Sequence, residues 1–347
     1  MALALKTALS PMPQFLPERK KLPVPDKSDF SLTQIFASLG GGLAAAAVFA
    51  VITKGTLAGL LLAHLAPLPI MIVALGFGLR HGATSAIIAT GLLSIWPHPV
   101  FGLVYGFLVA LPAALGAFVV SGAPVRERDK LTTRLPAWAV LSMGVALVVA
   151  TSVAVTSAVL HFGSLDEALN PLRAKAYLII EDMIRAQDLG DRLDAKHLSG
   201  VAAYAFPATL TAYVLLAHSL NLWAAGQIAK ASSLLSRPWP DIAVEFVLPR
   251  AVSAVFAIAV AVATLGEIGG EIGLIVAETL GLALALQGLA VAHALLRGAR
   301  AGAVSLTIIY FVVGLLGWPI VFFTALGVAD AAFSFRARKA AAQERRG

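Results

Sequence analysis

The sequence predicts an all-α protein, a polytopic transmembrane helix bundle with about eight spans and a C-terminal hydrophobic hairpin or ninth span. Composition is the first observation. Hydrophobic residues make up 59% of the 347 positions and charged residues 13%, whereas soluble globular proteins are about 45–50% apolar and about 25% charged. The second observation is that the apolar residues form continuous runs without period-two alternation. Runs of this kind cross about 30 Å of hydrocarbon as helices.

The candidate spans divide the chain into a membrane domain, residues 32–335, and two basic tails, residues 1–31 and 336–347. The first tail is expected to be disordered because prolines interrupt its short apolar stretches. Each span needs roughly 20 mostly apolar residues. The candidates are 33–52, 56–78, 82–97, 100–121, 137–160, 199–223, 249–266 and 273–295.

A last apolar stretch, residues 303–329, leaves two arrangements open. Gly317-Trp318-Pro319 lies near its middle, and proline removes a helix hydrogen bond and clashes with the preceding turn. This break favours a hairpin of two short helices. A kinked single span is the alternative, and it would place the two tails on opposite sides of the membrane.

The distribution of basic residues predicts the orientation in a bacterial inner membrane. Lysine and arginine are enriched in cytoplasmic loops. A cytoplasmic N-terminus places the other basic loops on the same side over eight crossings, and the opposite loops, including 266–271, are acidic or balanced. The basic residues of the two tails are Lys6, Arg19, Lys20, Lys21, Lys27, Arg336, Arg338, Lys339, Arg345 and Arg346.

Residues 164–197 form the one long segment between spans with an amphipathic pattern. Apolar residues recur at helical spacing, and charged residues fill the other positions. Asn170-Pro171 is expected to begin the helix, because proline is tolerated in a first turn. The segment is expected on the extracytoplasmic surface or as a cap on the bundle. A lid over an outward-facing cavity is the functional alternative.

No motif in the sequence predicts an enzyme. The chain has no cysteine, no phosphate-binding glycine loop, no zinc-binding His-Glu-x-x-His and no Gly-x-Ser-x-Gly elbow. We therefore expect no catalytic residue, no metal site and no cofactor. The net charge of +7 comes from short clusters beside apolar runs, which indicates topology signals rather than nucleic-acid binding. The expected partners are the lipid bilayer, other membrane proteins and a small solute of unknown identity.

Four polar residues within span 199–223 form the candidate ligand-binding site: Tyr204, Thr211, His218 and Asn221. At about 100° per residue the first three fall within roughly 40°, and the fourth widens the arc to about 100°. Polar groups in a span are costly, so this stripe is expected to face protein or a wet cavity. Its two interpretations are hydrogen bonding between helices and contact with a ligand.

One further span and the end of the last apolar stretch carry isolated polar residues. Glu278, Gln287 and His293 lie in span 273–295, where Gln287 is the deepest and faces away from Glu278. A proton relay from Glu278 to His293 would need partners on other helices. Asp330 has two interpretations, as an ion-pair partner of Arg336 or as the end of the last hydrophobic helix.

Three stretches together resemble the YybS-like family of polytopic bacterial membrane proteins, in its alphaproteobacterial form. The resemblance covers roughly residues 35–336. It implies distant similarity to the substrate-binding membrane subunits of energy-coupling-factor vitamin transporters, and it supplies no catalytic residue. The stretches are Leu65-Ala66-Pro67-Leu68-Pro69-Ile70, Asn221-Leu222-Trp223 through Arg237-Pro238-Trp239-Pro240-Asp241, and Leu316-Gly317-Trp318-Pro319 through Gly327-Val328-Ala329-Asp330.

Two functional hypotheses follow. The first is a transport component that binds a small solute between helices and has no ATPase of its own. It is motivated by the polar stripe and by the fold that the resemblance implies. The second is a non-enzymatic membrane scaffold in envelope morphogenesis, motivated by basic tails that could contact partners or anionic lipid.

Overall fold

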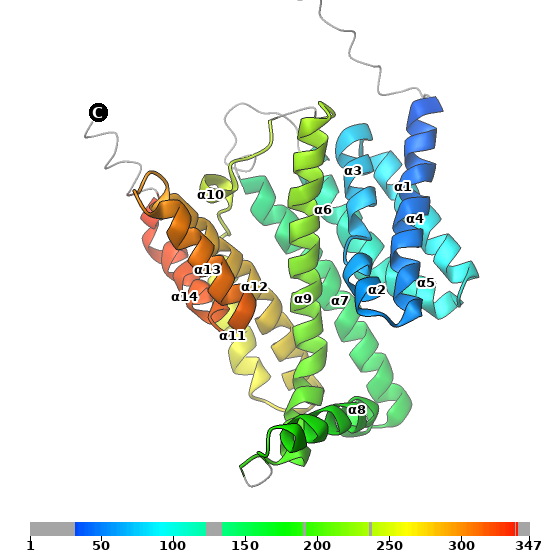
Figure 1. Cartoon of the computed structure of the whole chain (residues 1–347), viewed down its shortest axis with the longest axis vertical. Coiled ribbons are helices and arrows are strands. Elements are labelled where there is room, and N and C mark those ends of the chain that lie inside the picture. Colours follow the sequence, from blue (N-terminus) through cyan, green and yellow to red (C-terminus); the bar gives the residue numbers. More distant parts are fainter. Residues whose placement is uncertain (1–31, 123–133, 190–191, 236–237, 337, 339–347) are drawn as a thin grey trace, which may run out of the picture.

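A computed structural model of the chain describes residues 32–122, 134–189, 192–235, 238–336 and 338 (Figure 1). The predicted tail 1–31 and all of 336–347 except Arg336 and Arg338 lie outside these residues. Within them the regular structure is entirely helical. Its elements are α1 (Leu32–Ala50), η1 (Val51–Lys54), α2 (Leu57–Ala63), α3 (Pro67–Phe77), α4 (Leu79–Ile95), α5 (Pro99–Tyr105), the π-helical turn η2 (Gly106–Ala110), α6 (Leu111–Gly122), α7 (Leu135–Phe162), α8 (Leu165–Ala186), α9 (Ala195–Ala231), α10 (Ile242–Glu245), α11 (Ala251–Ala263), α12 (Glu267–Leu296), α13 (Gly302–Leu316) and α14 (Ile320–Phe333).

The prediction of an all-α polytopic bundle is confirmed. Six helical segments of the described chain are long and apolar enough to cross a membrane, and α11, α13 and α14 are shorter apolar helices. The predicted span 249–266 is therefore less regular than expected. Its helix has 13 residues, about 20 Å at 1.5 Å per residue, and follows a non-helical stretch at 246–250. The six segments are Leu32–Lys54, Leu57–Phe77, Pro99–Ser121, Leu135–Phe162, Ala195–Ala231 and Glu267–Leu296.

Small residues let α1 pack closely against α3 and α4. A Cβ atom on Gly41 would lie 2.7 Å from the Val73 side chain, and one on Gly42 would lie 2.8 Å from Ile88. The Ser85 hydroxyl donates to the Ser38 carbonyl oxygen at 2.8 Å across the same contact. Glycine in a span allows this approach of two helix backbones, so α1 is fixed to the N-terminal half of the bundle.

Helix α9 lies between the two halves of the molecule. Figure 1 shows α1 to α6 on one side of it and α10 to α14 on the other. Its contacts with α3, α7 and α12 agree with this arrangement. Its 37 residues extend over about 55 Å, so it also reaches α8 at one end. Helix α12 is the most buried of the candidate spans, and it packs against α7, α9, α11 and α14.

The amphipathic segment forms α8, which lies across the end of the bundle where α7 ends and α9 begins (Figure 1). The Ser164 hydroxyl accepts a hydrogen bond from the Glu167 N–H at 3.1 Å and caps the helix. The prediction that Asn170-Pro171 begins this helix is wrong, because Pro171 lies inside it. The serine cap satisfies an N-terminal donor about two turns before the proline could start the helix.

The last apolar stretch is a hairpin rather than a kinked single span. α13 ends at Leu316, Gly317 adopts a φ of 70°, and α14 begins at Ile320. A positive φ favours glycine and reverses the chain here. Figure 1 shows the end of α14 and the start of α1 at the same end of the bundle, opposite α8.

Candidate functional site

Three members of the predicted stripe are buried where α9 meets other helices. Thr211, His218 and Asn221 are each less than 6% exposed. The Thr211 hydroxyl lies 2.9 Å from the Thr151 hydroxyl of α7 and donates to the Pro207 carbonyl oxygen at 2.7 Å. This pair joins α9 to α7.

His218 and Asn221 each reach a backbone carbonyl group of another helix at a π-helical turn or a helix end. The two ring nitrogens of His218 lie 2.8 Å from the Val214 oxygen and 3.0 Å from the Val109 oxygen in η2. The Asn221 amide donates to the His64 carbonyl oxygen at 2.7 Å, just beyond the end of α2. A π-helical turn and a helix end leave carbonyl oxygens without regular partners. These side chains therefore satisfy backbone groups that lipid could not.

Tyr204 lies apart from the other three, against the first turns of α12. A Cβ atom on Gly270 would lie 3.1 Å from its hydroxyl oxygen. The structure thus brings Thr211, His218 and Asn221 into contacts between helices and places Tyr204 nearer the α8 end. The hydrogen bonds of these three residues join helices or bind their own helix backbone, whereas the buried Asn221 Oδ1 accepts none among the described residues. Contact of the stripe with a ligand stays a prediction.

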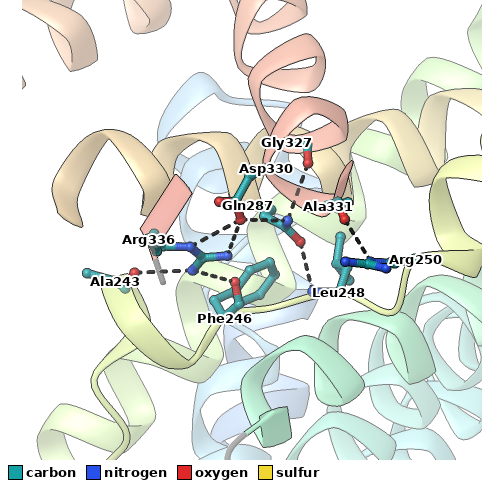
Figure 2. Close-up of polar contacts among 9 residues, drawn as sticks. All are labelled: Ala243, Phe246, Leu248, Arg250, Gln287, Gly327, Asp330, Ala331 and Arg336. Carbon is teal, nitrogen blue, oxygen red and sulfur yellow. Dashed lines mark hydrogen bonds and ion pairs between the residues drawn. The ribbon is translucent and has the colours of Figure 1, made fainter. Parts of the chain in front are cut away.

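A second polar cluster joins α12, α14 and the non-helical stretch before α11 (Figure 2). The Gln287 side-chain oxygen accepts from the Leu248 N–H at 2.8 Å, and its nitrogen donates to Asp330 at 3.1 Å. Asp330 pairs with Arg336 at 2.7 Å, which confirms the first of its two interpretations, and the side chains are 4% and 9% exposed. Arg336 also donates to the Ala243 and Phe246 carbonyl oxygens at 3.2 and 2.9 Å.

A more exposed ion pair lies at the same end of α12. The Arg297 guanidinium donates to both Asp241 oxygens, at 2.6 and 3.0 Å. These hydrogen bonds hold the pKa of the Asp241 carboxyl below its usual range. A lowered pKa in the folded state means that the stabilisation is present at neutral pH and is lost as the pH falls through that pKa. Both side chains are about half exposed, so the pair contributes at most about 1 kcal/mol.

An apolar cleft of about 180 Å³ lies between α7, α9, α11 and α12. It opens near the middle of α7 and α12, where the two halves of the bundle meet. Thr279 contributes the one hydroxyl of its lining. Leu215 connects it to the stripe, because this residue lies between Thr211 and His218 on α9. Its lining residues are Val140, Leu141, Gly144, Val145, Val148, Val149, Leu215, Val255, Val276, Thr279, Leu280 and Ala283.

Two features escaped the sequence interpretation. The cleft is lined by residues of the kind that face lipid, so no local pattern marks it. The second is Glu271, predicted in an outer loop at 266–271. That placement is wrong, because α12 begins at Glu267 and buries Glu271 completely. Its position seven residues before Glu278, on one helix face, was the available signal.

Comparison with known proteins places the chain in a family of membrane proteins. Residues 43–331 match the family model described as "Predicted membrane protein (DUF2232)", which is most of the chain. No curated protein and no solved structure matches it. The YybS-like resemblance and the distant similarity to vitamin-transporter subunits therefore stay predictions. The chain belongs to the DUF2232 family of predicted membrane proteins.

Proposed function

We propose that the chain is a small-solute-binding component of a transport system in the bacterial inner membrane, without an ATPase of its own. The apolar cleft is the observation that supports this proposal. Binding sites in helix bundles are found between helices, and their linings are mainly apolar. The cleft lies at the junction of the two halves, near the middle of the central helices, where transporters commonly place their substrates.

The lining defines the chemistry of the solute. Apolar side chains surround the cleft, and the hydroxyl of Thr279 donates to the Ile275 carbonyl oxygen at 2.7 Å. An apolar cavity of about 150 Å³ accommodates a benzene-sized molecule. The solute that fits is therefore a small apolar group, or the apolar portion of an amphipathic molecule. Thr211 and His218, the stripe residues on either side of Leu215, would fix the position of α9 at the side of the cleft rather than bind the solute.

Filling the cleft is expected to remove solute binding while the bundle stays folded. Val145 is 63% exposed at its edge, so Val145→Trp places an indole in the opening without entering the core. The protein would be purified in mild detergent, its bound molecules identified by mass spectrometry, and the identified solute added back in a thermal-shift titration. We expect no solute-induced shift for Val145→Trp.

Val153→Trp is the matched control, since Val153 is on the same helix, is 60% exposed and does not line the cleft. It should retain the shift. Equal shifts in both variants would contradict solute binding in the cleft. Recovery of envelope proteins without a solute would favour the scaffold hypothesis, and recovery of bulk lipid alone would remove the support for transport.

The orientation belongs to this proposal. The chain has no cysteine, so a single introduced cysteine reports one side of the membrane. Ser334, after α14, and Gln187, after α8, are exposed at opposite ends of the bundle. With a cytoplasmic N-terminus, a membrane-impermeant maleimide added to intact spheroplasts should label Gln187→Cys and spare Ser334→Cys. The reverse pattern would invert the proposed topology.

A further inference from the structure

A buried carboxylate on α12 has no partner in the described part of the chain. Glu271 is 0% exposed, and neither of its oxygens accepts a hydrogen bond there. The ion pairs among the described residues do not include it. An isolated anion in a low-dielectric interior is strongly unfavourable unless a positive charge neutralises it. Glu271 therefore needs a cation that this part of the chain does not provide.

The groups around Glu271 are electronegative. Glu278 lies seven residues further on the same face of α12, and the two carboxylates interact electrostatically. The Tyr204 hydroxyl of α9 approaches Gly270, and it also interacts electrostatically with Glu271. α11 contributes no titratable residue between positions 251 and 263. Among the described residues, Glu278 and Tyr204 are thus the titratable groups that interact electrostatically with Glu271.

The end of α11 adds one backbone oxygen atom close to position 270 of α12, which the Tyr204 hydroxyl also approaches. A Cβ atom on Gly270 would lie 3.2 Å from the Ala263 carbonyl oxygen, and one on Gly273 would lie 2.6 Å from the Ala263 nitrogen. α11 ends at Ala263, so the negative end of its dipole is directed at this part of α12. Carboxylate, hydroxyl and carbonyl oxygens are the ligands that hard cations prefer.

We propose that Glu271, together with Glu278 and the Tyr204 hydroxyl, forms a binding site for a monovalent cation, either a proton or a sodium ion. One bound positive charge neutralises Glu271, the one fully buried carboxylate among the residues that the structure describes. Glu278 is only partly buried and lies against Thr209, so it tunes the site from one side. The site is at the α8 end of α12, and its existence does not depend on solute binding in the cleft.

Thermal unfolding in detergent tests the proposal. A sodium site predicts that the Tm of the wild-type protein rises in sodium chloride relative to choline chloride at equal ionic strength. A proton site predicts that this Tm falls as the pH rises, because the deprotonated carboxylate has no partner. In either case Glu271→Gln should lose the response. Glu267→Gln, one turn earlier and exposed, should keep it. Identical responses of the wild type and Glu271→Gln to both variables would overturn the site.

A second measurement needs no change at position 271. Dicyclohexylcarbodiimide modifies protonated carboxyl groups in apolar surroundings, and peptide mass spectrometry compares Glu271 with Glu267 in one wild-type sample. Selective modification of Glu271 that sodium slows identifies a sodium site. Modification that depends on pH alone identifies a proton site. An unmodified Glu271, with a Tm that responds to neither sodium nor pH, would overturn the proposal.

Discussion

Arg336→Met is expected to lower the free energy of unfolding by about 3–5 kcal/mol, because it leaves the buried Asp330 carboxylate without its charge partner. The pair is nearly inaccessible, with side chains 4% and 9% exposed. The same substitution also removes donors to the Ala243 and Phe246 carbonyl oxygens. Unfolding by a denaturing detergent in mixed micelles, followed by circular dichroism, measures the change.

The chain offers a matched control two residues away. Arg338 is exposed, so Arg338→Met should change the free energy of unfolding by less than about 0.5 kcal/mol. The double variant Asp330→Leu with Arg336→Met should recover most of the loss, because no buried charge then remains. Equal losses in the free energy of unfolding for Arg336→Met and Arg338→Met would show that Arg336 acts only through the net charge of the protein and not through its pair with Asp330.

Gly327→Ala is expected to force α12 and α14 apart. A Cβ atom on Gly327 would overlap the Leu284 carbonyl oxygen, and one on Gly288 would overlap the Phe323 carbonyl oxygen. Both obstacles are helix backbone, which no change of side-chain rotamer can relieve. Overpacking of this kind costs about 1–3 kcal/mol, and more where the surroundings are rigid. The same unfolding experiment measures it.

Gly314→Ala is the control for helix propensity. Gly314 lies in α13, and a Cβ atom there would meet nothing within 4 Å. Alanine in a helix interior is favoured over glycine by about 0.5–1 kcal/mol, so this variant should be neutral or more stable. A stabilising Gly327→Ala would mean that the two helices do not touch through their backbones.

The general architecture could be predicted from the sequence because a continuous apolar run of span length is stable in a bilayer only as a helix, which satisfies its own backbone hydrogen bonds. The sequence alone does not decide between a hairpin and a single span, since Gly317-Trp318-Pro319 permits both a break and a kink. The conformation of Gly317 and the packing of α14 on α12 decide for the break. Pairing of Asp330 with Arg336 was one of two interpretations, because residues six apart meet only if the helix ends between them.

The errors in the sequence interpretation have a physical cause. Gly266, Gly269 and Gly270 indicate a loop by composition, yet α12 begins at Glu267. Gly273 is needed because the α11 backbone passes too close for a side chain there. A glycine in a membrane helix can thus mark a close contact with the backbone of another helix. A single sequence does not show which helices are in contact. The same limit applies to the cleft, since valines that line it resemble valines that contact lipid.

The ion pair in Figure 2 also orders the steps of biogenesis. Arg336 follows α14 along the chain, whereas the carbonyl oxygens that it binds belong to Ala243 and Phe246. Those oxygens leave the ribosome before the guanidinium that will satisfy them exists. The C-terminal half therefore completes its packing only once α14 has been synthesised and its end has folded back onto α10.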